Sequence, residues 1–264
     1  MLKEIIIAIQ AYYQAHQFIK ANKLWKWIII PGIIYCLLFW GGMYYFSNTS
    51  SEFIEWIALK TGLKSWLDKE DSGLLGFLFT MGGLIVWLVL MLFYFSLFKY
   101  LFLIIGSPLF SYLSEKTESI IEGKDYPFSF SQLGKDMVRG IRLAGRNGLW
   151  QTVYTISIVI LSLIPVVGWL TPVMAIIIEC YYYGFSMLDY SMERHKKSPS
   201  ESIFFISGHK GLAIGNGLVF YIMHLIPVLG WILAPTYAVV AATLSIYPLK
   251  QQQQQPEAKA EPVI

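Results

Sequence analysis

Two uncharged breaks in apolar sequence carry the first candidate chemistry. The phrase LIPVVGWLTP occupies residues 163–172, and the related phrase LIPVLGWILAP occupies residues 225–235. Proline lacks an amide donor and glycine is conformationally loose, so each phrase predicts a turn between two helices. The turn residues are Pro165, Gly168, Pro227 and Gly230.

The helix after each turn is where an anion can bind. Thr171-Pro172 and Ala234-Pro235 suit the start of a helix, because a proline in the first position loses no hydrogen bond. A helix N-terminus presents unpaired N–H groups and about half a positive charge. Two such ends at membrane depth can bind or pass an anion without a buried Lys or Arg. The alternative is that the turns only let short helices double back, with Thr171 capping its own helix.

Two groups of charged side chains are candidates for handling an anion. The first group is Lys20, Lys23 and Lys26, which precede the first long apolar stretch and can attract an anion. Glu179 is the one acid deep in an arm of a predicted hairpin. An ionisable group inside a membrane is costly, so Glu179 is a candidate for proton coupling or gating. The alternative is a pair with a Lys or a Tyr.

Enzyme chemistry has no support in the sequence. There is no HExxH motif, no Gly-x-Ser-x-Gly motif and no glycine loop that would bind phosphate. The four histidines are scattered and lack metal-ligand spacing, and the two cysteines form no CxxC pair. We therefore expect no enzyme, metal or cofactor. The net charge of +3 is too small to indicate nucleic-acid binding.

Composition sets the class of protein that must position these residues. Of the 264 residues, 56% are hydrophobic and only 14% are charged, against roughly 25% in soluble domains. The prediction is an all-α integral membrane protein with a single helical membrane domain over residues 1–250. It has two long transmembrane helices, two Pro/Gly-broken re-entrant hairpins and cytoplasmic amphipathic helices. No cleavable signal peptide is recognisable, so the first membrane helix serves as its own insertion signal.

The first half of the chain contains the two transmembrane helices. Residues 28–46 carry no charge and form the first, and residues 73–105 form the second. Residues 1–26 predict an amphipathic segment on the membrane surface. Residues 106–148 predict a cytoplasmic helical segment, with Ser107-Pro108 starting a new helix.

One face of the cytoplasmic segment is basic. Its members recur at steps of three or four and are Lys135, Arg139, Arg142 and Arg146. Such a face is typical of contact with solvent or lipid headgroups. The alternative is a cytoplasmic mouth that attracts anions.

The second half contains the two hairpins, at 149–188 and 212–249, and a low-complexity tail at 251–264 that is predicted to be disordered. Each hairpin arm is shorter than the roughly 20 residues of a full span, which favours partial insertion. Trp169 and Trp231 favour the alternative of full crossing, because tryptophan is enriched at membrane interfaces. Basic residues collect in segments that place the N-terminus and the hairpin entrances in the cytoplasm.

Several segments resemble the CysZ-type sulfate permeases, part of the etoposide-induced membrane-protein domain family. The matching segments occur in order: SPLF at 107–110, IPVVG at 164–168, Asp189-Tyr190 followed by His195-Lys196, and AAT at 241–243. The resemblance implies two long transmembrane helices, two partly penetrating hairpins and a homo-oligomer. It also implies sulfate uptake for cysteine biosynthesis, without ATP hydrolysis, in the bacterial inner membrane.

The chain departs from that family at one position. Its permeases carry Pro-Gly-hydrophobic-Arg-Arg before the first helix, whereas residues 21–27 read ANKLWKW. Lys23 and Lys26 keep the positive charge but lack the planar fork of arginine. The sequence predicts a multi-pass permease for a small inorganic anion, sulfate first. The alternative is a non-transporting membrane scaffold or partner-binding protein on the same fold.

Overall fold

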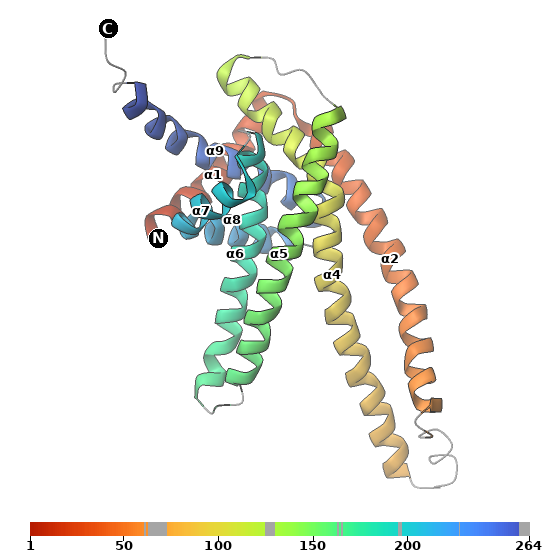
Figure 1. Ribbon diagram of the computed structural model, residues 1–264. Coiled ribbons are helices and arrows are strands. Elements are labelled where there is room, and N and C mark those ends of the chain that lie inside the picture. The colour runs from red at the N-terminus through yellow and green to blue at the C-terminus, as the bar shows by residue number, and fades with distance from the viewer. Residues whose placement is uncertain are drawn as a thin grey trace. The chain divides into compact units, whose positions relative to one another are not determined.

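The chain folds into helices. The computed structural model describes residues 1–60, 62, 73–124, 130–162, 164, 166–194, 197–226 and 228–258, and no strand occurs among them. The elements, shown in Figure 1, are α1 (Leu2–Ala21), α2 (Trp25–Lys60), α4 (Gly73–Glu122), α5 (Phe130–Ser162), the 3-10 helix η1 (Val167–Leu170), α6 (Thr171–Arg194), α7 (Pro199–Gly208), α8 (Lys210–His224) and α9 (Leu229–Ala258).

Length and composition agree with a membrane protein. Within the described part of the chain, α2 and the Leu229–Leu249 part of α9 are long and apolar enough to cross a bilayer. Helices α7 and α8 pass the same test as a pair that bends by 87°. The prediction of an all-α integral membrane protein is confirmed.

The residues separate into two compact units, and α2 and α4 contribute to each. The smaller unit is Cys36–Phe102. Inside it, the Tyr94 hydroxyl donates to the Phe39 carbonyl at 3.0 Å, and the Tyr94 ring stacks on Phe46 at 4.9 Å. A side chain at Gly42 would lie 2.7 Å from the Tyr94 hydroxyl, so glycine permits this close approach.

The larger unit, Met1–Tyr35 with Leu103–Ile264, is built around α8. Glycines let neighbouring backbones approach this helix closely. A Cβ on Gly217 would lie 2.0 Å from the Cys180 carbonyl oxygen of α6, and one on Gly215 would lie 2.9 Å from Ile5 Cα of α1. Helix α8 is therefore packed between α1 and α6, and it also contacts α9.

Helix α1 was predicted to lie on the membrane surface, but one of its faces is part of the core. Ala8, Ala11 and Ala15 are buried, while Tyr13 is exposed. The Tyr12 hydroxyl donates to the Asn216 carbonyl of α8 at 2.8 Å. Burial raises the pKa of Tyr12 well above its usual value, so the phenol stays protonated as a donor. The small alanines explain how α1 packs so closely on α8.

Two predicted boundaries are wrong. Helix α4 runs through Ser107-Pro108 without restarting, and Pro108 lies inside it. Proline removes one backbone hydrogen bond, but Phe110 and Leu113 remain buried beyond it, and their packing favours a continuous helix. Helix α9 continues to Ala258, past the start of the predicted disordered tail, because glutamine is a good helix former. Residues 259–264 lie outside the described part.

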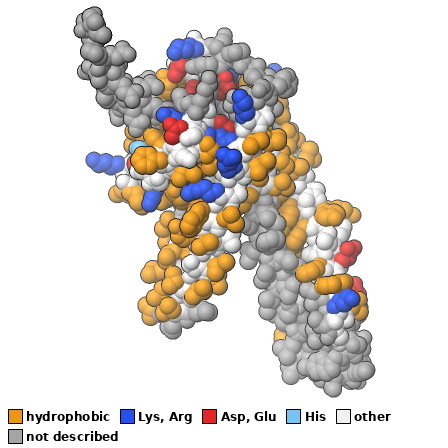
Figure 2. Space-filling view, in the orientation of Figure 1, with side chains coloured by type: hydrophobic (Ala, Val, Ile, Leu, Met, Phe, Trp, Pro, Cys, Tyr) orange, Lys and Arg blue, Asp and Glu red, His pale blue; other side chains and the backbone are white. Residues whose placement is uncertain are grey.

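The hairpin formed by α5 and α6 has an apolar surface. Helices α5 and α6 run side by side, and hydrophobic side chains cover the visible face of this hairpin (Figures 1 and 2). Hydroxyl groups on α5 donate to carbonyls of their own helix, as in Thr152 to Gly148 and Ser157 to Val153. Such internal bonds let hydroxyl-bearing residues face hydrocarbon, where no water is available.

Candidate functional site

The lysine cluster lies at the junction of α1 and α2. Leu24 N–H donates to the Ile19 carbonyl at 3.1 Å, and Lys23 N–H donates to the Lys20 carbonyl at 3.4 Å. Lys23 has φ 53°, so α1 ends in a Schellman motif with a lysine at the left-handed position where glycine is usual. Lys20, Lys23 and Lys26 are all exposed, as an anion-attracting cluster requires.

The two hairpin turns share one backbone geometry. Gly168 N–H donates to the Ile164 carbonyl and Gly230 N–H donates to the Ile226 carbonyl, each at 2.9 Å. Val166 and Val228 both have positive φ, of 73° and 63°, which is strained for a β-branched residue. Pro165 and Pro227, the other predicted turn residues, lie outside the described part of the chain.

The helix ends after the turns differ from the prediction. Helix α6 begins at Thr171, but the Thr171 N–H and hydroxyl both donate to the Gly168 carbonyl. Helix α9 begins at Leu229, so Ala234 and Pro235 lie within the helix rather than at its N-terminus. The expectation of free N–H groups at Ala234-Pro235 is wrong, because the turn is closed earlier, at Gly230. Thr171 and Pro172 keep their predicted position at a helix start.

Glu179 joins three helices. It accepts hydrogen bonds from the Gln151 side chain of α5 and from the Tyr221 hydroxyl of α8. A pair with a tyrosine is one of the predicted alternatives for Glu179, and Tyr221 is that partner. Glu179 therefore ties the first hairpin to the first arm of the second.

The basic face of α5 is not uniform. Lys135 and Arg142 are exposed and Arg146 is half-buried, but the Arg139 side chain is only 11% exposed. Arg139 donates to both oxygens of Asp189, at 2.7 and 3.2 Å, and to the Ser202 hydroxyl at 2.6 Å. The prediction that Arg139 belongs to a solvated face is wrong: helical spacing cannot show that α6 and α7 cover it.

Arg139 is the centre of a buried polar cluster. It also donates to the Lys197 carbonyl and lies 3.8 Å from Glu193, whose other oxygen accepts from Ser111 at 2.5 Å. A guanidinium that binds a carboxylate through two nitrogens is geometrically specific as well as strong. The cluster fixes α5, α6 and α7 relative to one another near the base of the first hairpin.

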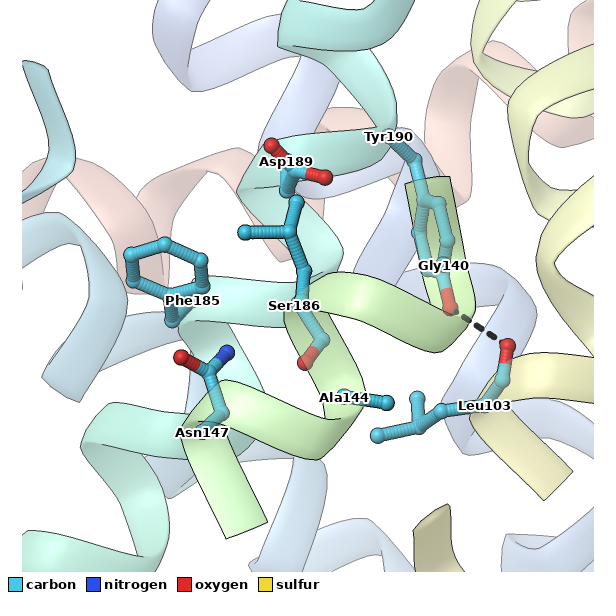
Figure 3. A pocket seen from close by; sticks show the side chains of 9 residues that line it. Leu103, Gly140, Ala144, Asn147, Phe185, Ser186, Asp189 and Tyr190 are labelled. Atoms are coloured by element: carbon cyan, nitrogen blue, oxygen red, sulfur yellow. Dashed lines mark hydrogen bonds between the residues drawn. The ribbon is translucent and has the colours of Figure 1, made fainter. Parts of the chain in front are cut away.

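A small pocket lies beside this cluster, between α5 and α6. Asn147, Ser186, Asp189 and Tyr190 supply its polar walls, and Leu103 is one of its apolar residues (Figure 3). The Tyr190 hydroxyl donates to the Leu103 carbonyl at 2.9 Å. The sequence indicates Asp189-Tyr190 only through the family resemblance and does not predict a role for Asn147. Its position directly after Arg146 in an amphipathic helix was the only available signal.

Lysine, arginine and side-chain amide groups are donors of the kind that bind anions in proteins. No group of three metal-binding side chains occurs among the described residues. Among the described residues, Lys20, Lys23 and Lys26 gather at the α1–α2 junction, and Lys135, Arg139, Arg142 and Arg146 are distributed along α5.

Comparison with known proteins identifies relatives. The family described as "Sulfate transporter CysZ/Etoposide-induced protein 2.4" matches residues 12–235. Sulfate transporter CysZ of Pseudomonas fluorescens strain Pf-5 is 29% identical over 143 residues, which cover 53% of this chain and 57% of that protein. The transporter of Pseudomonas paraeruginosa strain PA7 is 27% identical over 197 residues, covering 73% of this chain and 76% of its own. That of Pseudomonas fluorescens strain Pf0-1 is 27% identical over 219 residues, covering 82% and 83%. The chain thus spans little more than half of the first relative and most of the other two.

Proposed function

Because the chain belongs to the sulfate transporter CysZ/etoposide-induced protein 2.4 family, we propose that it is a permease for a small inorganic anion, with sulfate as the first substrate. The observation that carries this proposal is the extent of the match. Residues 12–235 include the lysine junction, both hairpin turns and the buried Arg139 cluster. The relatives are bacterial transporters, which favours a transporter in a bacterial membrane over an enzyme.

The lysine junction is proposed to collect the anion. Three exposed cations within seven residues raise the local concentration of an anion and speed its arrival. The start of α6 at Thr171-Pro172 is proposed to line the route beyond them. Lysine donates hydrogen bonds as a point charge, so the site should bind more weakly than one with an arginine fork.

The protein is proposed to lie in the inner membrane as a homo-oligomer, with its N-terminus in the cytoplasm and its two hairpins inserted part way. From Leu149 to Ser162, α5 has 14 residues, or roughly 21 Å, against about 30 Å of hydrocarbon. Cysteines placed at Gly168 and Gly230 test insertion in intact cells. Full labelling of both from outside would contradict partial insertion. The mass of the native complex in detergent tests assembly.

The direct test of function is the flux of labelled sulfate into proteoliposomes. We expect uptake above that of empty vesicles, and competition by other tetrahedral oxyanions. Correctly folded protein without any flux would refute the permease and support a membrane scaffold on the same fold.

Lysine variants test the role of the junction. The double change Lys23→Gln with Lys26→Gln should raise the KM for sulfate, because it removes two of the three charges. The matched double change to arginine keeps the charge and adds the planar fork, so it should lower KM. Equal KM values for both would exclude the junction from anion binding.

Glu179→Gln tests coupling. The amide keeps the shape of the side chain but no longer titrates. If flux and its pH dependence both stay unchanged, Glu179 only joins helices.

A further inference from the structure

The Asn147 amide presents a donor to the pocket at the base of the first hairpin. Its side-chain oxygen accepts from Arg146 Nη1 at 2.9 Å. Turning the amide over would place two sets of N–H donors against each other, so Arg146 fixes the orientation. Asn147 is 0% exposed, and its Nδ2 has no hydrogen-bond partner among the described residues. A buried donor without a partner is costly, which points to a ligand that accepts from it.

The pocket has room for part of a ligand. Figure 3 shows the Asn147 nitrogen and the Ser186 hydroxyl pointing toward the same space between α5 and α6. Ser186 donates to the Tyr182 carbonyl at 3.2 Å, so its hydroxyl proton is already used. The pocket volume is about 10 Å³, which is room for one water-sized group and too small for a whole polyatomic anion.

The charges around the pocket favour an acceptor oxygen. Asp189 is the only acid that lines it, and both of its oxygens accept from Arg139. The Arg146 guanidinium stands 6.0 Å from the centre of the Phe185 ring, which is itself part of the pocket wall. The Asp189 carboxylate is thus paired, while the Arg146 guanidinium lies next to two residues of the pocket wall, Asn147 and Phe185.

We propose that Arg146 and Asn147 form a second binding station for the transported oxyanion, distinct from the lysine junction. One oxygen of a tetrahedral oxyanion enters the pocket and accepts a hydrogen bond from Asn147 Nδ2. The rest of the anion stays outside, where Arg146 balances its charge. This inference rests on the proposed anion transport. It places the station at the base of the first hairpin, between α5 and α6.

Asn147→Asp is the sharpest test. Aspartate has the shape of asparagine and can still accept from Arg146, but it presents an acceptor to the pocket instead of a donor. We expect the KM for sulfate to rise about tenfold or more, the size of one lost charge-assisted hydrogen bond. Gln10→Glu is the matched control: it makes the same chemical change on the exposed side of α1 and should leave KM unchanged.

Asn147→Leu separates an anion from a bound water or an empty pocket. Leucine removes the donor without adding charge. If the station is used, the KM for sulfate rises while the protein stays folded. If Asn147 is merely an unpaired amide, leucine raises the melting temperature and leaves KM unchanged. If it only holds a water, leucine changes neither KM nor sulfate binding. The last two results would each overturn the proposal.

Equilibrium binding of labelled sulfate to the purified full-length protein separates this inference from the proposed function. Binding that Asn147→Asp weakens, without any flux, would support the station and refute the permease. Flux that both Asn147 variants leave intact would refute the station and retain the permease. If the wild-type protein binds no sulfate, the station is wrong.

Discussion

The two hairpins have the same turn, but their arms differ in burial. In the first, Trp169 is 88% exposed and only Gln151 and Ile158 are buried along the α5 arm. In the second, α8 lies between α1 and α6, and the α9 stretch from Ala238 to Ala242 is fully buried. A repeated phrase therefore encodes a repeated turn, while the residues of the arms decide how deeply each arm is buried in the protein. The arms of the second hairpin belong to the core, whereas the α5 arm of the first leaves apolar side chains exposed.

The largest expected effect concerns the link at the base of the first hairpin. Arg139→Ala leaves Asp189 buried beside Glu193 without the guanidinium, and we expect a loss of about 3–5 kcal/mol in the free energy of unfolding. Arg142→Ala, on the exposed side of the same helix, should change it by less than about 0.5 kcal/mol. Thermal unfolding in detergent measures both. Equal effects would mean that the cluster does not hold α5, α6 and α7 together.

The second largest effect concerns the glycines, whose replacement should change stability in opposite directions in the two hairpins. Gly217→Ala would force a Cβ against the Cys180 carbonyl, and we expect about 2–3 kcal/mol of destabilisation as α8 moves away from α6. Gly145→Ala on α5 meets nothing within 4 Å and should stabilise by roughly 0.5–1 kcal/mol, because alanine is the better helix former. Opposite signs of the shift in melting temperature are the expected result.

The two tryptophans test the contrast directly. The Trp231 ring lies 6.1 Å from the His224 ring, so Trp231→Ala should cost about 2 kcal/mol through lost contacts. Trp169→Ala should cost less than about 0.5 kcal/mol in detergent, because its ring projects away from the protein. A larger effect at Trp169 would contradict the assignment of the second hairpin, and not the first, to the core.

The smallest expected change in stability comes from the two valines with positive φ, and it should be equal in both hairpins. Val166→Gly and Val228→Gly relieve a positive φ that costs a non-glycine residue about 1–2 kcal/mol, partly offset by the greater chain entropy of glycine. We expect each to change stability by no more than about 1 kcal/mol and in the same direction. Unequal shifts would show that surroundings, and not the shared backbone, set the turn geometry.

Composition and periodicity predicted much of the fold. Long apolar runs indicated membrane helices, and Pro and Gly indicated the two turns, since these residues act through their own backbone. The start of α9 was missed because Pro235 also fits inside a helix once the turn closes at Gly230. The start of a helix at Ser107-Pro108 was wrong because packing of the following residues maintains α4.

The candidate site was less predictable. Lys20, Lys23 and Lys26 were found because their charges lie close together in sequence. The pairing of Arg139 with Asp189 joins residues 50 positions apart, which no local pattern reveals. Asn147 becomes a candidate binding residue only because α6 residues line the same pocket.

By itself, the sequence determined the class of protein, the two turns and the cationic junction, because hydrophobicity, backbone chemistry and net charge are local properties. Only the tertiary structure decided which hairpin forms the core and which arginine is buried. It also decided that the Asn147 donor faces a pocket. Burial depends on which helices pack together, and close packing depends on small residues of one helix meeting the backbone of another.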